Sequence, residues 1–286
     1  MPSLIDIRRR IRSVKNTQQI TKAMKMVSAA KLRRAQDRVI AARPYGSLLR
    51  KVLANVAAAV ASDESAGENP LLARRPEQRV LLVLVTGDKG LAGAFNSNTI
   101  KGAQRFLTEH EGASVQLELI GRKGRDFFRK RGARVAGEQI GLAAKVVYAD
   151  VAAIARRAMD MYRAEEIDAV YLVFNEFKSV VSQKLTLTRV LPVEMPEHTT
   201  PVDYIFEQPP TEMLASLLPR YVEMEFYRAL LESAAAEHAA RMTAMEAATS
   251  NAGEMIEKLT LYMNRVRQAS ITKEIIEVVS GAAAAE

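Results

Sequence analysis

The fold of this chain is decided by its long C-terminal stretch, which reads LESAAAEHAARMTAMEAATSNAGEMIEKLTLYMNRV over residues 231–266. Residues without charge recur there at alternating steps of four and three, and the series runs through Leu231, Ala235, His238, Met242, Met245, Thr249, Ala252, Ile256, Leu259, Met263 and Val266. A sustained heptad of this kind predicts a helix that packs along a second helix. No proline follows Pro219, so we expect this helix to extend from about Thr211 to about Ala285.

The other end of the chain supplies the predicted partner helix. The segment from Ser3 to Ala41 contains no helix breaker, and Ser3 followed by Asp6 resembles a helix start. Pro44 interrupts the pattern before it resumes over residues 48–60. We therefore expect either one long helix bent near Pro44 or two helices in sequence.

A thin apolar stripe runs along this N-terminal segment. Residues 20–36 read ITKAMKMVSAAKLRRAQ, and Ile20, Met24 and Val27 share one face of a helix because they recur at steps of four and three. We expect that stripe to press on the partner helix. Lysines and arginines surround it, so the remaining surface must face water or a partner.

Positive charge is concentrated at the same end. Residues 1–51 hold fourteen Lys or Arg against Asp6 and Asp37, a local net charge of +12 in a chain of +8, so the remainder is −4. Residues 220–286 carry seven basic against ten acidic residues. The two ends are complementary, which predicts an antiparallel coiled coil. The exposed basic surface leaves nucleic acid, anionic lipid and an acidic protein partner open.

Between the helices the composition changes to that of an α/β domain. Strands are predicted at RVLLVLVT from Arg79, at VQLELI from Val115 and over residues 168–177, with helices up to His110, from Gly121 and over residues 142–164. This alternation predicts a mainly parallel sheet. The segment VVSQKLTLTRVLPV is predicted to add an antiparallel strand at the sheet edge. The expected fold is therefore an antiparallel coiled coil of long terminal helices with a central Rossmann-like α/β domain.

Several chemistries are excluded by composition. The chain has no cysteine, which rules out disulfides, thiolate metal sites and thiol catalysis and fits a reducing compartment. His110, His198 and His238 lie far apart without a metal-binding neighbour, so we interpret them as structural and expect no metal. The N-terminus lacks the apolar core of a secretory signal, and no apolar run reaches the ~18 residues of a membrane span.

The glycine-rich turn after the first strand invites a nucleotide-binding interpretation. Gly87, Gly90 and Gly93 match neither GxGxxG nor a P-loop, so a strand-to-helix turn that needs positive φ is favoured. Asp88 and Lys89 follow the strand where α/β sites often lie, but no catalytic set accompanies them. We expect no catalytic residue and no cofactor, and a Rossmann-like nucleotide-binding enzyme stays open as an alternative.

A basic-helix nucleic-acid-binding protein is the other alternative. No aromatic residue precedes Tyr45, so stacking on single strands has no support, although a basic helix can lie in a groove.

Both ends of the chain resemble one family, the gamma subunits of F-type ATP synthases. The resemblance rests on ITKEIIEVVSGAAA at residues 271–284, NTQQITKAMKMVSAAKLRRAQ at residues 16–36 and ATSNAGEMIEKL at residues 248–259. It also covers the order helix, α/β domain, helix. The absence of the cysteine-bearing insert of chloroplast members and of a transit peptide indicates a bacterial form.

The resemblance implies a rotor shaft without catalytic residues of its own. In the family, the terminal helices stand inside a ring of three alpha and three beta subunits, and the lower part meets the epsilon subunit and the membrane c-ring. Proton flow turns the c-ring and shaft, which drives ATP synthesis. The implied location is peripheral, on the cytoplasmic face of the bacterial inner membrane, with indirect membrane contact and no nucleic acid. The small apolar tail at residues 278–285 fits a part that turns without strong hydrogen bonds.

The family also implies which residues couple the shaft to the ring. Met24 and Lys25 match the place where the shaft meets a beta-subunit loop. The corresponding C-terminal residues are Arg241, Arg267, Gln268, Thr272 and Glu274. We expect the working parts to be residues 1–60 and 208–286 as shaft helices, 61–78 as linker and 79–207 as the α/β domain.

Overall fold

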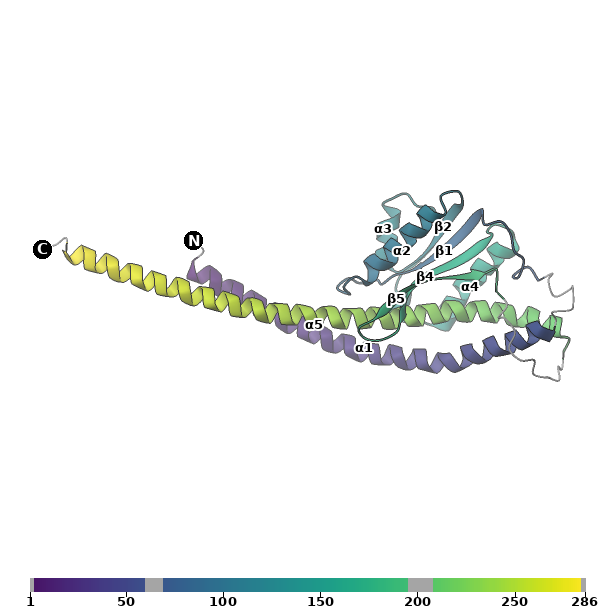
Figure 1. Ribbon diagram of the computed structural model, residues 1–286, viewed down its shortest axis with the longest axis horizontal. Helices are drawn as coiled ribbons and strands as arrows, with labels where there is room; N and C mark the ends of the chain where they lie inside the picture. Colours follow the sequence, from purple (N-terminus) through teal and green to yellow (C-terminus); the bar gives the residue numbers. More distant parts are fainter. Residues whose placement is uncertain (1–2, 60–68, 195–207, 284–286) are drawn as a thin grey trace. The chain divides into compact units, whose positions relative to one another are not determined.

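The computed structural model describes residues 3–59, 69–194 and 208–283. The chain forms two compact units, one of Met1–Ser28 with Met242–Glu286 and the other of Ala29–Arg241, called here the helical unit and the sheet unit. Helices α1 (Leu4–Ala59) and α5 (Pro210–Ala283) contribute to both units (Figure 1). The prediction of two long terminal helices is confirmed. The polar loop predicted at residues 61–70 lies mostly outside the described residues.

Helix α1 begins with the predicted cap. The Ser3 hydroxyl accepts a hydrogen bond from the Asp6 backbone N–H at 3.2 Å, and the Asp6 carboxylate accepts one from the Ser3 N–H at 3.2 Å. This reciprocal arrangement is a capping box. Of the two forms expected around Pro44, the structure has the single helix. Pro44 is exposed, so the carbonyl that loses its N–H partner can bond to water instead.

The sheet unit contains a five-stranded sheet in the order β3-β2-β1-β4-β5. Its strands are β1 (Arg79–Val85), β2 (Ser114–Ile120), β3 (Val135–Gln139), β4 (Ala169–Phe177) and β5 (Gln183–Leu191). Strands β3, β2, β1 and β4 pair in parallel, and β5 pairs antiparallel with β4 at the edge. The Rossmann-like sheet and its antiparallel edge are confirmed.

Helices cover the two faces of this sheet (Figure 1). Helices α2 (Phe95–Glu109) and α3 (Arg122–Arg129) pack on one face, where Phe106 and Phe128 join the core with Leu82 and Leu117. On the other face lie α4 (Tyr148–Arg163) and α5, and the guanidinium of Arg228 from α5 lies 5.9 Å from the ring centre of Phe174 in β4. Helix α5 is therefore packed directly on the sheet within this unit.

Two elements differ from the sequence prediction. Strand β3 was not predicted, because its residues VAGEQ include alanine, glycine, glutamate and glutamine, which are poor strand formers. The helix expected over residues 142–164 is instead a 3₁₀ turn at Leu142–Ala144 followed by α4. Among the described helices, none is long and apolar enough to cross a membrane.

Candidate functional site

The helical unit is built on a seam between α1 and α5, which run antiparallel. From α1 the buried or half-buried seam positions include Ile7, Ile11, Val14, Gln18, Thr21, Lys25 and Ser28, and from α5 they include Met245, Thr249, Ala252, Ile256, Leu259, Met263 and Val266. The α5 heptad seen in the sequence is thus confirmed as the contact stripe of this unit. Steps of four and three on both helices keep each stripe facing the other.

Polar contacts fix the register of this seam. The hydroxyls of Thr21 and Thr249 share a hydrogen bond of 2.7 Å, and the Gln18 side-chain amide donates to the Thr249 carbonyl at 3.4 Å. Lys25 forms an ion pair of 2.5 Å with Glu246. Sliding one helix along the other would break these three contacts, although each threonine hydroxyl would keep its bond to a carbonyl of its own helix. The seam therefore has a defined axial position despite its small residues.

The prediction that Ile20, Met24 and Val27 form the contact stripe of α1 is wrong, because the buried face lies one residue further along the helix. Ile20 is 59% exposed and Val27 is 55% exposed, whereas Met24 is half-buried at the edge of the seam. The buried positions are instead Thr21 and Ser28. Two small polar residues that hydrogen-bond locally or across the seam can occupy a close helix contact, and the larger apolar side chains of α1 are left outside.

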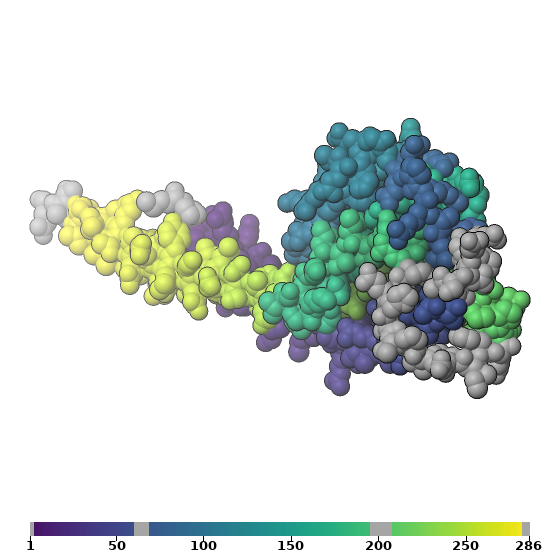
Figure 2. All heavy atoms as spheres, turned by 45° about the vertical axis from the view of Figure 1, so that its right-hand side comes forward, coloured from purple at the N-terminus to yellow at the C-terminus, as the bar shows by residue number. Residues whose placement is uncertain are grey.

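The outer surface of α1 is basic as expected. The exposed cations that α1 contributes to the helical unit are Arg8, Arg9, Arg10, Arg12, Lys15 and Lys22. Within the described residues, none of these has a carboxylate within 4.0 Å. Because these cations repel one another and attract anions, this face is suited to an acidic partner. Figure 2 shows α1 in purple beside the yellow end of α5.

Among the described residues of this unit, no second helix lies against the end of α5. All described side chains after Ser270 are exposed, including Ile275, Ile276, Val278 and Val279, and the yellow end of α5 extends past the start of α1 (Figures 1 and 2). An exposed apolar row of this length indicates a surface that is covered by a partner.

Four of the five C-terminal residues predicted to couple lie on this stretch or directly before it. Arg267, Gln268, Thr272 and Glu274 are exposed, and the Thr272 hydroxyl donates back to the Gln268 carbonyl at 3.0 Å. Glu274 accepts a hydrogen bond of 3.4 Å from Ser270. These contacts stay within the helix, so the four side chains are presented outward. Met24 and Lys25 belong to the same unit, but no described contact joins them to these four residues.

Arg241 differs from the other predicted residues because it is engaged inside the sheet unit. Its side chain is 11% exposed and pairs with Glu237 at 2.5 Å. It also donates to the Gly90 carbonyl, on the loop that follows β1, at 3.3 Å. A guanidinium with these partners fastens α5 to that loop.

Four buried carboxylates on α5 were missed by the sequence analysis. Glu223, Glu225, Glu232 and Glu237 are all buried within the sheet unit. Glu223 pairs with Arg156 of α4 at 2.6 Å and accepts from the Tyr148 hydroxyl at 2.6 Å. Burial and the bond to Glu223 raise the pKa of Tyr148 to about 12. Buried charges are tolerated when they are paired, so this row ties α5 to its neighbours at defined positions.

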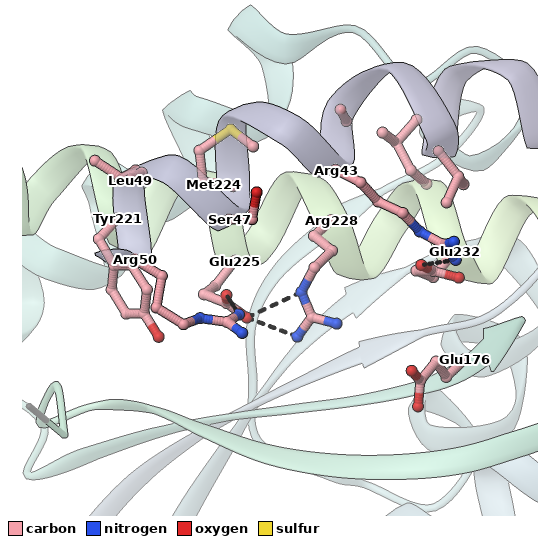
Figure 3. A pocket seen from close by; sticks show the side chains of 14 residues that line it. Arg43, Ser47, Leu49, Arg50, Glu176, Tyr221, Met224, Glu225, Arg228 and Glu232 are labelled. Atoms are coloured by element: carbon pink, nitrogen blue, oxygen red, sulfur yellow. Dashed lines mark hydrogen bonds and ion pairs between the residues drawn. The ribbon is translucent and has the colours of Figure 1, made fainter. Parts of the chain in front are cut away.

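A cavity beside this row is shown in Figure 3. Glu225 accepts from Arg50 of α1 at 3.1 Å and from Arg228 at 2.7 Å. Glu232 pairs with Arg43 of α1 at 3.5 Å. The sequence held one signal for this row, because Glu225 and Glu232 lie seven residues apart and Glu223 and Glu237 fourteen, which places each pair on one helix face. Their burial could not be predicted, since it depends on arginines that are distant in the sequence.

At the carboxyl end of β1, Asp88 bonds to two backbone groups of the chain itself. The Asp88 carboxylate accepts backbone N–H bonds of 3.1 Å from Arg122, at the start of α3, and from Gly141. An α/β nucleotide site would place a phosphate near such a helix start. Gly93 has φ +54 as the turn interpretation expected, whereas positive φ was not found at Gly87 or Gly90. No group of residues able to hold a metal occurs within the described ranges.

The histidines are engaged in packing where they are described. The His110 ring stacks on Phe106 with ring centres 3.9 Å apart, and His238 is half-buried on α5. His198 lies outside the described residues.

Comparisons with known proteins identify relatives along the whole chain. A family model described as ATP synthase matches residues 3–285. The chain is 81% identical over 286 residues to an ATP synthase gamma chain of Solibacter usitatus, with all of both chains covered. It is 52% identical over 289 residues to one of an Anaeromyxobacter species, covering 99% of each.

Solved structures agree with these relatives. The central stalk and c-ring structure of Tetrahymena thermophila mitochondrial ATP synthase contains a chain similar to this one, with a TM-score of 0.61 and 26% identity, covering 80% of this chain and 99% of that one. A chain of the Euglena gracilis mitochondrial ATP synthase has a TM-score of 0.66 at 18% identity, covering 98% and 94%, which shows the shared fold.

Proposed function

We infer, from the premise that this chain belongs to the ATP synthase family and is a gamma chain within it, that it is the central rotor shaft of an F-type ATP synthase. In this role it transmits rotation of the membrane c-ring to the catalytic ring of three alpha and three beta subunits. Proton flow is thereby coupled to ATP synthesis or hydrolysis. The observation that carries the proposal is the 81% identity to a gamma chain over the full length.

The geometry of the helical unit supports this role. A shaft must keep its two helices in register while it presents different surfaces to its surroundings. The Thr21 to Thr249 bond and the Lys25 to Glu246 pair hold the register. The basic outer face of α1 suits acidic loops of the ring. Residues 278–283 at the end of α5 carry no charged side chain that would hold them in one orientation.

Contacts within the sheet unit attach α5 to the α/β domain, so that α5 turns when this domain is turned. Ion pairs connect α5 to α4 through Glu223 and to α1 through Glu225 and Glu232. A pair broken on one side leaves an uncompensated buried charge, which costs several kcal/mol, about 3–5. Rotation of the α/β domain without α5 would break the pair of Glu223 with Arg156 and the hydrogen bond from the Phe177 backbone N–H to Glu232, so the two turn together.

We further propose that the chain is non-catalytic and that the chemistry of ATP belongs to the alpha and beta subunits. The buried carboxylates of the sheet unit are engaged by arginines, as in the pair of Asp168 with Arg79 at 2.7 Å. The position that a nucleotide phosphate would take beside β1 is held by Asp88. Neither alternative, a nucleotide-binding enzyme or a nucleic-acid-binding protein, gains support from these contacts.

We place the chain at the cytoplasmic face of the bacterial inner membrane, attached through the epsilon subunit and the c-ring. For the working parts, we propose residues 1–60 and 208–286 as the shaft, 61–78 as linker and 79–207 as the α/β domain. The coupling surface proposed on the shaft comprises Met24, Lys25, Arg241, Arg267, Gln268, Thr272 and Glu274.

Two experiments test the rotor role. The tagged full chain, purified from membranes in mild detergent, should bring alpha, beta and epsilon subunits with it, and the untagged chain serves as control. A probe attached to the chain in the reconstituted complex should then rotate in one direction during ATP hydrolysis. Recovery of nucleic acid or a lone small molecule in place of these subunits, or a probe that stays still while ATP is hydrolysed, would overturn the proposal.

A further inference from the structure

A small hollow lies within the sheet unit where α1 approaches α5. Its walls are residues of α1, of the segment after β3 and of α5, and they comprise Lys31, Arg34, Ala35, Arg38, Ala143, Ala144, Val146, Leu231, Ala234 and His238. The side chains of the four alanines are small, so the space between the longer side chains stays open. The cavity measures about 180 Å³, well below the ~300–1,000 Å³ of pockets for drug-sized ligands. It suits an ion better than a nucleotide.

The charged residues of this hollow all carry positive charge. Lys31, Arg34 and Arg38 recur at steps of three and four, so they share one face of α1. Within the described ranges, none of them has a carboxylate within 4.0 Å. Further along the same helix, Arg43 and Arg50 each pair with a glutamate of α5. In the hollow, therefore, the cations of α1 are not neutralised by glutamates of α5, as Arg43 and Arg50 are.

His238 reports the resulting positive field. Burial, the Arg241 guanidinium and the Lys31 ammonium lower the pKa of His238 to about 4. The cations that face it come from both helices, with Lys31, Arg34 and Arg38 on α1 and Arg241 on α5. Glu237, the carboxylate next to it on α5, is already paired with Arg241. An anion in the hollow would offset this field and allow the imidazole to take a proton.

We propose that this hollow binds a small multivalent oxyanion of the phosphate class, held by Lys31, Arg34 and Arg38. Guanidinium groups bind such oxyanions through paired N–H donors, and the lysine adds a point charge. The inference concerns a ligand site and does not depend on the rotor role.

Calorimetry on the full chain tests the site, with inorganic phosphate and pyrophosphate as probes at about 100 mM salt. Both should bind saturably with one ion per chain. The variant Arg34→Gln/Arg38→Gln should weaken binding about tenfold or more, because two charged donors are lost. The matched control Arg33→Gln/Lys51→Gln removes the same number of charges from α1 and should change binding by less than about twofold, because neither side chain lines the hollow and their remaining effect is screened by salt.

The protonation of His238 supplies a second readout. Its ring signal is identified by NMR as the resonance lost in His238→Gln. Saturating pyrophosphate should raise its pKa by about one pH unit or more. The proposal is overturned by absence of saturable binding, by equal weakening in the control variant, or by an unmoved His238 titration. Binding of an acidic peptide to these cations without competition from phosphate or pyrophosphate would overturn it too, and would show a protein-docking surface instead.

Discussion

Glu118 is a carboxylate whose burial disfavours its charged form. It points from β2 into the sheet unit, is 1% exposed, and its Oε1 has no hydrogen-bond partner among the described residues. Its other oxygen pairs with Arg157 of α4. Burial raises the pKa of Glu118 above its ordinary value of 4.5 in spite of the nearby arginine. The folded chain therefore holds this proton more tightly than the unfolded chain does.

The sign of the pH dependence follows from this direction. The stabilising contribution of protonated Glu118 is fully present below pH 4.5 and is lost as the pH rises through its folded-state pKa. The variant Glu118→Gln lacks this loss. We expect its free energy of unfolding, relative to the parent chain, to increase by on the order of 1 kcal/mol between about pH 4 and pH 7.

Urea unfolding across this pH range measures the effect. The control is Glu138→Gln, because Glu138 is only partly buried and lies 3.9 Å from Arg129. The change in stability across this range should be larger in Glu118→Gln than in this control, because the Glu118 carboxylate is 1% exposed. A relative stability of Glu118→Gln that declines with pH would show that attraction to Arg157 outweighs burial.

Met24 tests the coupling surface at the same scale. It is half-buried at the edge of the seam, beside Lys25. Met24→Lys adds a cation to a surface already rich in cations and changes what the ring contacts. We expect proton-driven ATP synthesis in membrane vesicles to fall severalfold, while the amount of assembled complex changes little.

The matched control is Met26→Lys, which adds the same charge at an exposed position on the same helix. Its loss of synthesis should be smaller. Equal losses of assembly and synthesis in Met24→Lys would mean that the residue serves packing rather than coupling.

At the scale of elements, two glycines illustrate how packing decides a substitution. Gly46 lies inside α1, and an added Cβ would meet Met224 at 3.9 Å, an ordinary contact. Gly137 lies in β3, and a Cβ there would overlap the Glu118 carboxylate and the Arg157 guanidinium. Gly46→Ala should stabilise the chain by about 0.5–1 kcal/mol because alanine favours the helix. Gly137→Ala should destabilise it by about 1–3 kcal/mol.

Urea unfolding of both variants at one pH checks the pair. Each serves as the control of the other, because both make the same chemical change. Destabilisation by Gly46→Ala would indicate that α1 requires the flexibility of glycine next to Pro44.

Some helices and strands could be predicted from the sequence, and others could not. The strands with continuous apolar runs, such as Arg79–Val85, were predicted because β-branched and leucine residues leave little choice. Strand β3 was not, since it owes its pairing to the neighbouring β2. The α5 seam was predicted from its heptad, but the α1 seam was not, because Thr21 and Ser28 occupy it while Ile20 is exposed.

At the scale of the whole molecule, the proposed role requires α1 and α5 of the helical unit to turn as one body. The hydroxyls of Thr21 and Thr249 lie 2.7 Å apart, and the chain has no cysteine of its own. Thr21→Cys/Thr249→Cys should therefore form a disulfide, whose sulfurs need a separation of about 2.05 Å. We expect the oxidised complex to keep its ATP synthesis rate within about twofold, because a bond inside a rigid body hinders nothing.

Oxidised and reduced complexes are compared in one preparation, with Thr21→Cys alone as control. Loss of synthesis on oxidation, restored by a thiol reductant, would show that the helices move against each other during the cycle.

The sequence by itself determined the two long helices, the alternating strands of the domain between them, the opposite charges of the ends and the membership of the family. These follow from periodicity, composition and motifs, which are local or additive properties. Only the tertiary structure decided the register of the α1 seam, the row of buried glutamates on α5 and the bonds of Asp88 to the backbone of Arg122 and Gly141. Each depends on a partner distant in the chain, and burial of a polar group is favourable only where that partner is present.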